Sequence, residues 1–129
     1  MSNQFSKNSL ARREGVNLKL VEISDLALKI SPIDFGIPDH GGRRTKREQN
    51  QLFQDKLSKC DGYEKKSKHQ DGKALDVYAY VDGKASWEEE HLSMVAAAML
   101  QAASQLGYKL EWGGLWTNFV DMPHFQLGK

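Results

Sequence analysis

Regularly spaced hydrophobic positions predict a helix in the first third of the chain. Leu20, Ile23, Ala27 and Ile30 recur at intervals of three and four residues, so they lie on one face of a helix. This pattern predicts a helix over residues 18–30. Pro32 follows at once, as is typical of a helix end.

Two later segments carry residues typical of helix ends. Thr45 followed by Glu48 forms a capping-box pattern, which predicts a helix over residues 45–58. Ser86 precedes a run of glutamates and Gly107 follows a long periodic segment, so these two residues bound a third predicted helix. The expected apolar stripes are Leu52, Phe53 and Leu57 in the second helix, and Leu92, Val95, Ala96, Met99, Ala103 and Leu106 in the third.

The strand-like segments gather in the second half of the chain. Leu75, Val77 and Ala79 alternate with polar residues, which predicts one strand with a single buried face. Helices first and strands late predict an α+β domain, with a small antiparallel sheet flanked by about three helices rather than repeated βαβ units. The predicted strands are 33–38, 74–81, 84–86 after the Asp82-Gly83 turn, 108–112 and 123–127.

Length and composition agree with one folded domain. The chain has 129 residues, of which 40% are hydrophobic, so we expect a single domain over 1–129 with a loose arm at 1–9 and no separate wall-binding domain. Cys60 is the only cysteine, which excludes an internal disulfide. The longest apolar run, residues 95–100, is too short to span a bilayer. The polar first residues lack a secretory signal, so we expect a cytoplasmic protein without stable membrane association.

The charge is unevenly distributed although the net charge is only +1. Residues 1–73 carry 15 basic and 10 acidic side chains, whereas residues 74–129 carry 3 and 7. Basic clusters at 43–47 and 65–68 form either solvated faces or a surface that attracts an anionic polymer. No nucleic-acid-binding motif accompanies them, so we expect no nucleic-acid partner.

Two histidines and one aspartate form a candidate metal site. Asp76 points away from the buried face of its predicted strand, and His124 points away from the core in the last strand. His69 lies in the loop that leads into the first of these strands. Two imidazoles and one carboxylate are a usual ligand set of catalytic zinc, and Asp121 offers a further carboxylate as general base. An ordinary surface or hydrogen-bonded histidine is the alternative for each imidazole.

The motifs around these residues resemble those of the zinc D-alanyl-D-alanine metallopeptidases, which include vancomycin-resistance dipeptidases and carboxypeptidases. The string S-x-H-x-x-G-x-A-x-D runs from Ser67 to Asp76, and a carboxylate-x-x-His follows at Asp121 and His124. The similarity is greatest to the phage branch, the L-alanyl-D-glutamate endopeptidases that serve as endolysins, and it covers roughly residues 8–128. Further similar segments are 31–36, 42–45 with Gln49 and Leu52, 77–84, 112–116 and 123–127.

The resemblance implies a Hedgehog/DD-peptidase-like fold and a single zinc ion held by His69, Asp76 and His124. It also implies that Asp121 is the catalytic carboxylate. It gives Arg44 the role of steadying the substrate carbonyl, although the neighbouring Arg43 is the alternative for this role. Two further residues, Ser67 and Trp112, are expected to line the substrate cleft, and core packing is the alternative for Trp112.

The implied function is zinc-dependent cleavage of the peptidoglycan stem peptide during host lysis by a phage or prophage. Because 129 residues leave little room for lid insertions, we expect an open groove and cleavage of the L-alanyl-D-glutamate bond. A D-alanyl-D-alanine carboxypeptidase or dipeptidase is the alternative within the family, and a non-catalytic zinc-containing binding module is a remote one. The resemblance implies a monomer that waits in the host cytoplasm until it is released to the wall.

Overall fold

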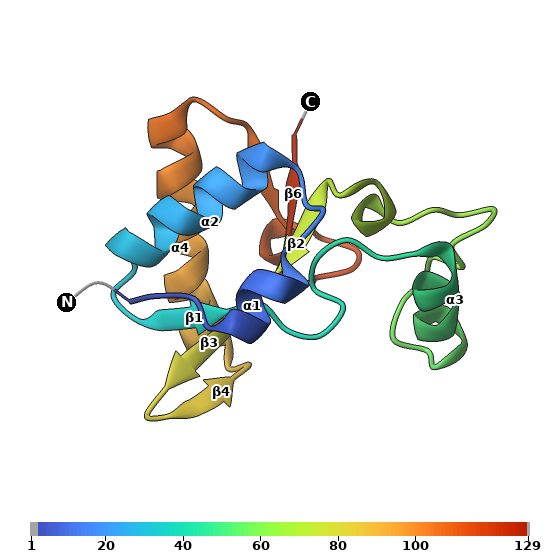
Figure 1. Ribbon diagram of the computed structural model, residues 1–129, viewed down its shortest axis with the longest axis horizontal. Helices are drawn as coiled ribbons and strands as arrows, with labels where there is room; N and C mark the ends of the chain where they lie inside the picture. The colour runs from blue at the N-terminus through green and yellow to red at the C-terminus, as the bar shows by residue number, and fades with distance from the viewer. Residues whose placement is uncertain (1–2, 129) are drawn as a thin grey trace.

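The structure, a computed structural model, describes residues 3–128 and contains four α-helices and six short strands within that range (Figure 1). The helices are α1 (Lys7–Arg12), α2 (Leu18–Ile30), α3 (Lys46–Gln54) and α4 (Glu89–Leu106), with 3₁₀ turns η1 (Lys68–Asp71) and η2 (Gly113–Leu115). The strands are β1 (Asp34–Gly36), β2 (Ala74–Asp76), β3 (Tyr78–Val81), β4 (Lys84–Ser86), β5 (Leu110–Trp112) and β6 (His124–Leu127). The predicted α+β class is confirmed.

The strands form two three-stranded antiparallel sheets instead of the one sheet that we predicted. Their orders are β1-β3-β4 and β2-β6-β5. The predicted strand over 74–81 is divided at Val77, whose backbone N–H donates to the carbonyl of Pro123 at 2.9 Å. Residues before Val77 therefore pair with β6, whereas residues after it pair with β1.

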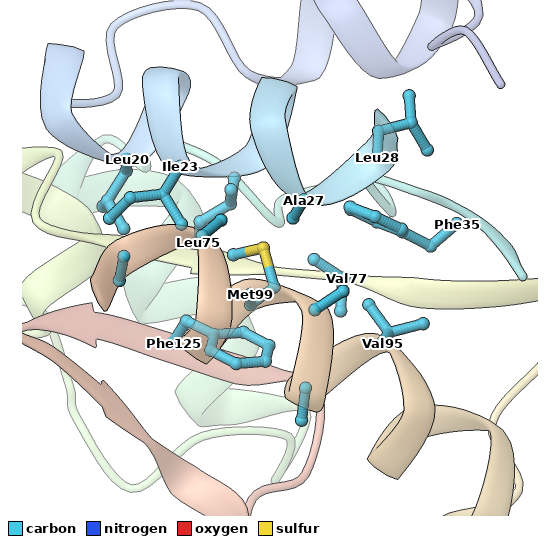
Figure 2. Close-up of a cluster of buried hydrophobic side chains, with 14 of the residues drawn as sticks. Leu20, Ile23, Ala27, Leu28, Phe35, Leu75, Val77, Val95, Met99 and Phe125 are labelled. Atoms are coloured by element: carbon cyan, nitrogen blue, oxygen red, sulfur yellow. The ribbon is translucent and has the colours of Figure 1, made fainter. Parts of the chain in front are cut away.

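One hydrophobic core joins helices α2 and α4 to both sheets (Figure 2). Helix α2 packs against α4, and Met99 of α4 reaches toward the strands. Leu75 of β2 and Phe125 of β6 are fully buried in this core, which fixes the two strands next to each other. The predicted stripe of α4 is confirmed, since Leu92, Val95, Ala96, Met99 and Ala103 are all buried.

The beginning of the described chain is ordered, so the prediction of a loose arm over residues 1–9 is wrong for residues 3–9. Helix α1 buries Ser9, whose hydroxyl accepts the backbone N–H of Ile37 at 3.0 Å. The Phe5 ring lies edge-on to Phe35, with 5.4 Å between the ring centroids. Sequence reasoning missed this part because Lys7–Arg12 is too short and polar for a clear periodicity. Residues 1 and 2 lie outside the described range.

The predicted helix ends are confirmed in part. Gly107 ends α4 in the left-handed conformation, and Thr45 and Glu48 form the predicted capping box of α3. Helix α3 ends at Gln54, earlier than expected, and its predicted apolar stripe is wrong, since Phe53 and Leu57 are exposed. The prediction that Ser86 caps α4 is wrong: α4 begins at Glu89 with Glu88 as its N-cap, and Ser86 is the last residue of β4, with its hydroxyl accepting the N–H of Glu88 at 3.3 Å.

Replacing Thr45 with alanine is expected to lower the free energy of unfolding by about 1 kcal/mol, because the N–H of Glu48 loses its side-chain acceptor. Urea denaturation measures this change. Thr117→Ala, in an exposed loop, is the matched control and should change stability little. Equal stability of the Thr45→Ala protein and the unmutated protein would show that the capping box contributes nothing.

Candidate metal centre

Three segments distant in sequence bring His69, Asp76 and His124 together. Asp76 is the last residue of β2 and lies directly opposite His124, the first residue of β6, in the antiparallel register. His69 comes from η1, whose start is capped by Ser67: the Ser67 hydroxyl accepts the N–H of His69 at 3.2 Å. Gly72 ends this turn in the left-handed conformation, and a side chain there would collide with the backbone of Gly15.

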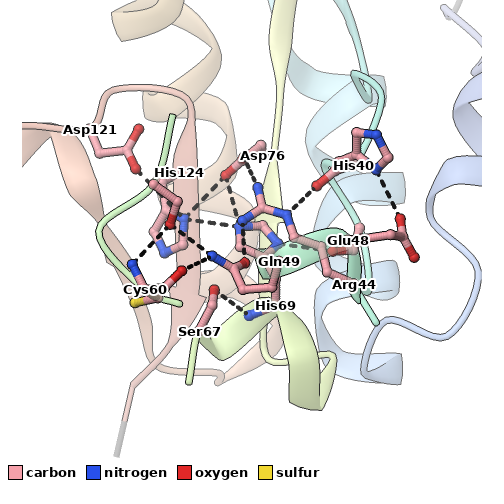
Figure 3. A network of polar contacts seen from close by, with 12 residues as sticks. His40, Arg44, Glu48, Gln49, Cys60, Ser67, His69, Asp76, Asp121 and His124 are labelled. Carbon is pink, nitrogen blue, oxygen red and sulfur yellow. Dashed lines mark hydrogen bonds and ion pairs between the residues drawn. The ribbon is translucent and has the colours of Figure 1, made fainter. Parts of the chain in front are cut away.

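The three side chains point one atom each at a common centre (Figure 3). His69 Nε2 lies 3.2 Å and His124 Nδ1 lies 3.1 Å from Asp76 Oδ1, and the two nitrogens are 3.3 Å apart. Ligand atoms about 2.0–2.2 Å from a tetrahedral zinc ion are roughly 3.3 Å from one another, so the spacing fits such an ion.

Hydrogen bonds outside the centre set the tautomer of both imidazoles. His69 Nδ1 lies 2.9 Å from the carbonyl of Gly42, which can only accept, so Nδ1 carries the proton and Nε2 is free to ligate. His124 Nε2 lies 2.9 Å from Gln126 Oε1, while the amide nitrogen of Gln126 donates to Glu111 at 3.0 Å. This arrangement leaves His124 Nδ1 free. Orienting partners of this kind are typical of histidines that bind metals.

The electrostatics of the centre also suit a cation. Burial alone would raise the pKa of Asp76, but with no ion bound the two imidazoles take the place of a cation when they are protonated: the charge of His69 and hydrogen bonds from both rings then hold that pKa well below its usual range. Burial alone would lower the pKa of His124, yet the hydrogen bond and negative charge of Asp76, together with the smaller effects of Gln126 and Asp121, raise it. Asp76 therefore remains an anion at neutral pH, as a metal ligand must.

Arg44 lies beside the centre in a fixed position. Its side chain donates to the carbonyl of His40 at 2.7 Å, to Gln49 Oε1 at 3.0 Å and to Asp76 Oδ2 at 3.2 Å. Burial lowers the pKa of Arg44, and nearby Asp76 opposes this effect. Arg43 instead lines a neighbouring cavity with Gly15, so of the two arginines it is Arg44 that reaches the metal centre.

Sequence reasoning gave no role to the residue that holds Arg44. Gln49 is fully buried although it is polar, and its amide nitrogen donates to Ser58 Oγ and to the carbonyl of Cys60, each at 2.8 Å. All of its hydrogen-bonding groups therefore have partners that tie α3 to the cleft. The sequence signal for Gln49 is its place, together with Leu52, among the segments that resemble the phage endopeptidases.

Asp121 lies at the edge of the centre. Its Oδ2 is 4.0 Å from His124 Nδ1, and burial raises its pKa, with the negative charge of Asp76 acting in the same direction. The backbone N–H of Asp121 donates to the carbonyl of Gly113 at 3.0 Å. A Cβ atom at Gly113 would lie 2.3 Å from the Asp121 carbonyl oxygen, so only glycine allows this close approach.

A cleft of about 410 Å³ opens above the three candidate ligands and Asp121. Ser67 lines it, as expected. The prediction that Trp112 lines it is wrong: the Trp112 ring stacks on Phe125 of the core, and its Nε1 donates to the carbonyl of Met122 at 2.7 Å. The tryptophan at the cleft is Trp116, whose ring lies 5.3 Å from that of His124.

Comparison with known proteins identifies the family. The profile of the family described as "Phage L-alanyl-D-glutamate peptidase" matches residues 1–127. The L-alanyl-D-glutamate peptidase of Escherichia phage T5 is 36% identical over 117 residues, which cover 90% of this chain and 83% of that protein. The crystal structure of the Serratia marcescens L-Ala D-Glu endopeptidase ChiX superposes with a TM-score of 0.85 at 33% identity, covering 98% of this chain and 91% of that one.

The fold and the site together are those of a peptidase with a candidate metal centre. The chain belongs to the family of phage L-alanyl-D-glutamate peptidases. Within residues 3–128, none of the helices has both the length and the apolar character needed to cross a membrane.

Proposed function

We propose that the protein is a zinc-dependent peptidoglycan hydrolase that cuts the L-alanyl-D-glutamate bond of the stem peptide. The observation that carries the proposal is the convergence of His69, Asp76 and His124 at the floor of a cleft, with Asp121 beside them. Two nitrogen donors and one carboxylate suit zinc and leave a coordination position open for chemistry. Family membership supports the choice of bond.

In this proposal His69, Asp76 and His124 hold the zinc ion. When bound, the ion polarises a substrate carbonyl and makes water more acidic. Asp121 accepts the proton of the attacking water and then delivers it to the nitrogen of the leaving amine. Arg44 places a fixed, partly desolvated positive charge where negative charge develops on the carbonyl oxygen, which is where such a charge is most effective.

Mass spectrometry of digested peptidoglycan tests the choice of bond. Cleavage at the proposed bond leaves stem peptides with a new amino-terminal D-glutamate and L-alanine as the new carboxyl terminus. Release of free D-alanine, with no cut nearer the sugar, would instead establish the carboxypeptidase or dipeptidase alternative. Tight binding to the wall with no cleavage would favour a non-catalytic module.

We further propose that the protein acts as a monomer and reaches the wall from the host cytoplasm after a separate factor has permeabilised the membrane. Family membership supports the wall as the place of action. Sedimentation analysis tests the first point and fractionation of infected cells before lysis tests the second. A stable dimer, or protein found outside the cytoplasm before lysis, would contradict these proposals.

The amide of Gln126 is expected to strengthen zinc binding because it orients His124. Gln126→Leu removes that acceptor and should weaken zinc affinity by about 10- to 100-fold. Competition with a fluorescent chelator measures the affinity. Gln101→Leu, on the exposed face of α4, is the matched control. Unchanged affinity of the Gln126→Leu protein would mean that His124 needs no such partner.

A further inference from the structure

One wall of the cleft is unusually rich in lysine. Lys59, Lys65, Lys66 and Lys68 all line the cleft that contains the metal centre, and all four are exposed. Within residues 3–128, none of their ammonium groups lies within 4.0 Å of a carboxylate. Their positive charge is therefore available to a ligand.

The loop that carries these lysines is held by its own hydrogen bonds. Asp61 Oδ1 accepts the backbone N–H groups of Tyr63 and Lys65, each at 2.9 Å. The side chain of Gln70, which follows the candidate ligand in η1, donates to the carbonyl of Gly62 at 2.9 Å. The lysine backbones therefore keep a defined position relative to the metal centre.

The cleft also has aromatic lining residues. Trp116 and Phe119 line it, and the ammonium group of Lys59 lies 4.6 Å from the centroid of the Phe119 ring. The carboxylate of Asp76 is already paired with Arg44 at 3.2 Å. The lining of the cleft thus offers both cationic and apolar groups to a substrate.

We propose that Lys65, Lys66 and Lys68 bind the free carboxylate of the D-glutamyl residue. Through this contact the enzyme selects substrates that carry the carboxylate. This inference rests on the proposed function. Glutamate has two carboxyl groups and only one can continue the peptide, so the other stays as a carboxylate next to the scissile bond. The small apolar alanine on the other side of that bond suits the aromatic lining of the cleft, which includes Trp116. Opposite charges placed in this way give specificity as well as affinity.

Two synthetic stem peptides that differ only at this carboxylate test the proposal. One keeps the free carboxylate of D-glutamate, and the other carries a carboxamide of the same shape. We expect the unmutated protein to cleave the carboxylate peptide with about tenfold higher kcat/KM, mainly through KM, since three modest ion pairs together amount to roughly this factor. The preference should shrink as salt is raised.

Variants of the three lysines test whether these side chains cause the preference for the carboxylate peptide. The triple variant Lys65→Gln, Lys66→Gln, Lys68→Gln should cleave the two peptides within about twofold of each other, because the opposite charges that favour the carboxylate are gone. The corresponding triple Lys→Arg variant, which keeps the charge, should retain the preference. Lys84→Gln removes the same charge from the distant strand β4 and is the control. Thermal unfolding verifies that each variant is folded.

The outcomes separate this inference from the proposed function. Equal kcat/KM of the unmutated protein for both peptides would overturn the lysine proposal, and so would a triple glutamine variant that keeps the preference. If neither peptide is cut, the proposed bond is wrong, and calorimetric binding of the two peptides then decides the lysine proposal. Equal affinities would overturn it, whereas tighter binding of the carboxylate peptide that is lost in the glutamine variant would support it.

Discussion

Asp121→Asn is expected to lower kcat by about 10²- to 10⁴-fold while zinc binding stays intact. The substitution keeps the size of the side chain, but an amide cannot accept a proton from the attacking water. Asp121 lies 4.0 Å from His124 and outside the group of three converging ligand atoms, so the ion should keep all of its protein ligands. Release of soluble stem peptide from purified peptidoglycan measures the rate.

Asp82→Asn is the matched control for this substitution. Asp82 lies in the exposed β3–β4 turn with a positive φ of 52°, a conformation that asparagine also adopts. Its kcat should equal that of the unmutated protein. Wild-type activity of the Asp121→Asn protein would remove Asp121 as the general base, and loss of zinc from that variant would make it a ligand instead.

Chelation of the metal is expected to abolish cleavage of peptidoglycan completely. The chain's remaining groups, Arg44 and Asp121, can position substrate and move a proton, but they do not polarise the carbonyl sufficiently by themselves. Adding zinc after removal of the chelator should restore the rate, whereas magnesium should not, because magnesium prefers an all-oxygen ligand set. Undiminished hydrolysis by verified metal-free protein would contradict a metal mechanism.

Metal removal should also lower thermal stability. The three ligand side chains converge from η1, β2 and β6, so a bound ion joins segments that otherwise meet only through packing and hydrogen bonds. A free ion concentration 1,000-fold above the dissociation constant stabilises the folded state by about 4 kcal/mol. Calorimetric melting with and without zinc measures this contribution, and an unchanged Tm would show that the ion does not bind the folded chain.

The sequence is sufficient to predict elements with strong local signals. Helix 18–30 has its predicted limits because most of its periodic apolar face is buried, although Ile30 is exposed, and because Pro32 follows it. The alternation at Leu75, Val77 and Ala79 is confirmed as a buried face, since all three are fully buried. The division of this segment at Val77 has no local signal, because the alternation continues unbroken. It arises from pairing with β6 and β1, which are distant in sequence.

In the candidate site, too, some features have a signal in the sequence and others depend on contacts between distant segments. The convergence of His69, Asp76 and His124 is implied by the resemblance of their motifs to the zinc metallopeptidases, and the structure brings the three side chains together. The prediction that Trp112 lines the cleft failed because the packing of β5 on β6, which stacks the Trp112 ring on Phe125, has no local signal in the sequence. Alternation along a strand of three residues is too short to decide which ring faces the cleft.

The zinc content of the purified protein tests the central claim most directly. After dialysis against buffer with a small excess of zinc, elemental analysis should find one zinc ion per chain. The Asp76→Ala, His69→Ala and His124→Ala variants should each hold far less at the same free zinc concentration, because each loses one of three ligands. Absence of zinc from the unmutated protein, or full zinc content in all three variants, would contradict a metal centre at this site.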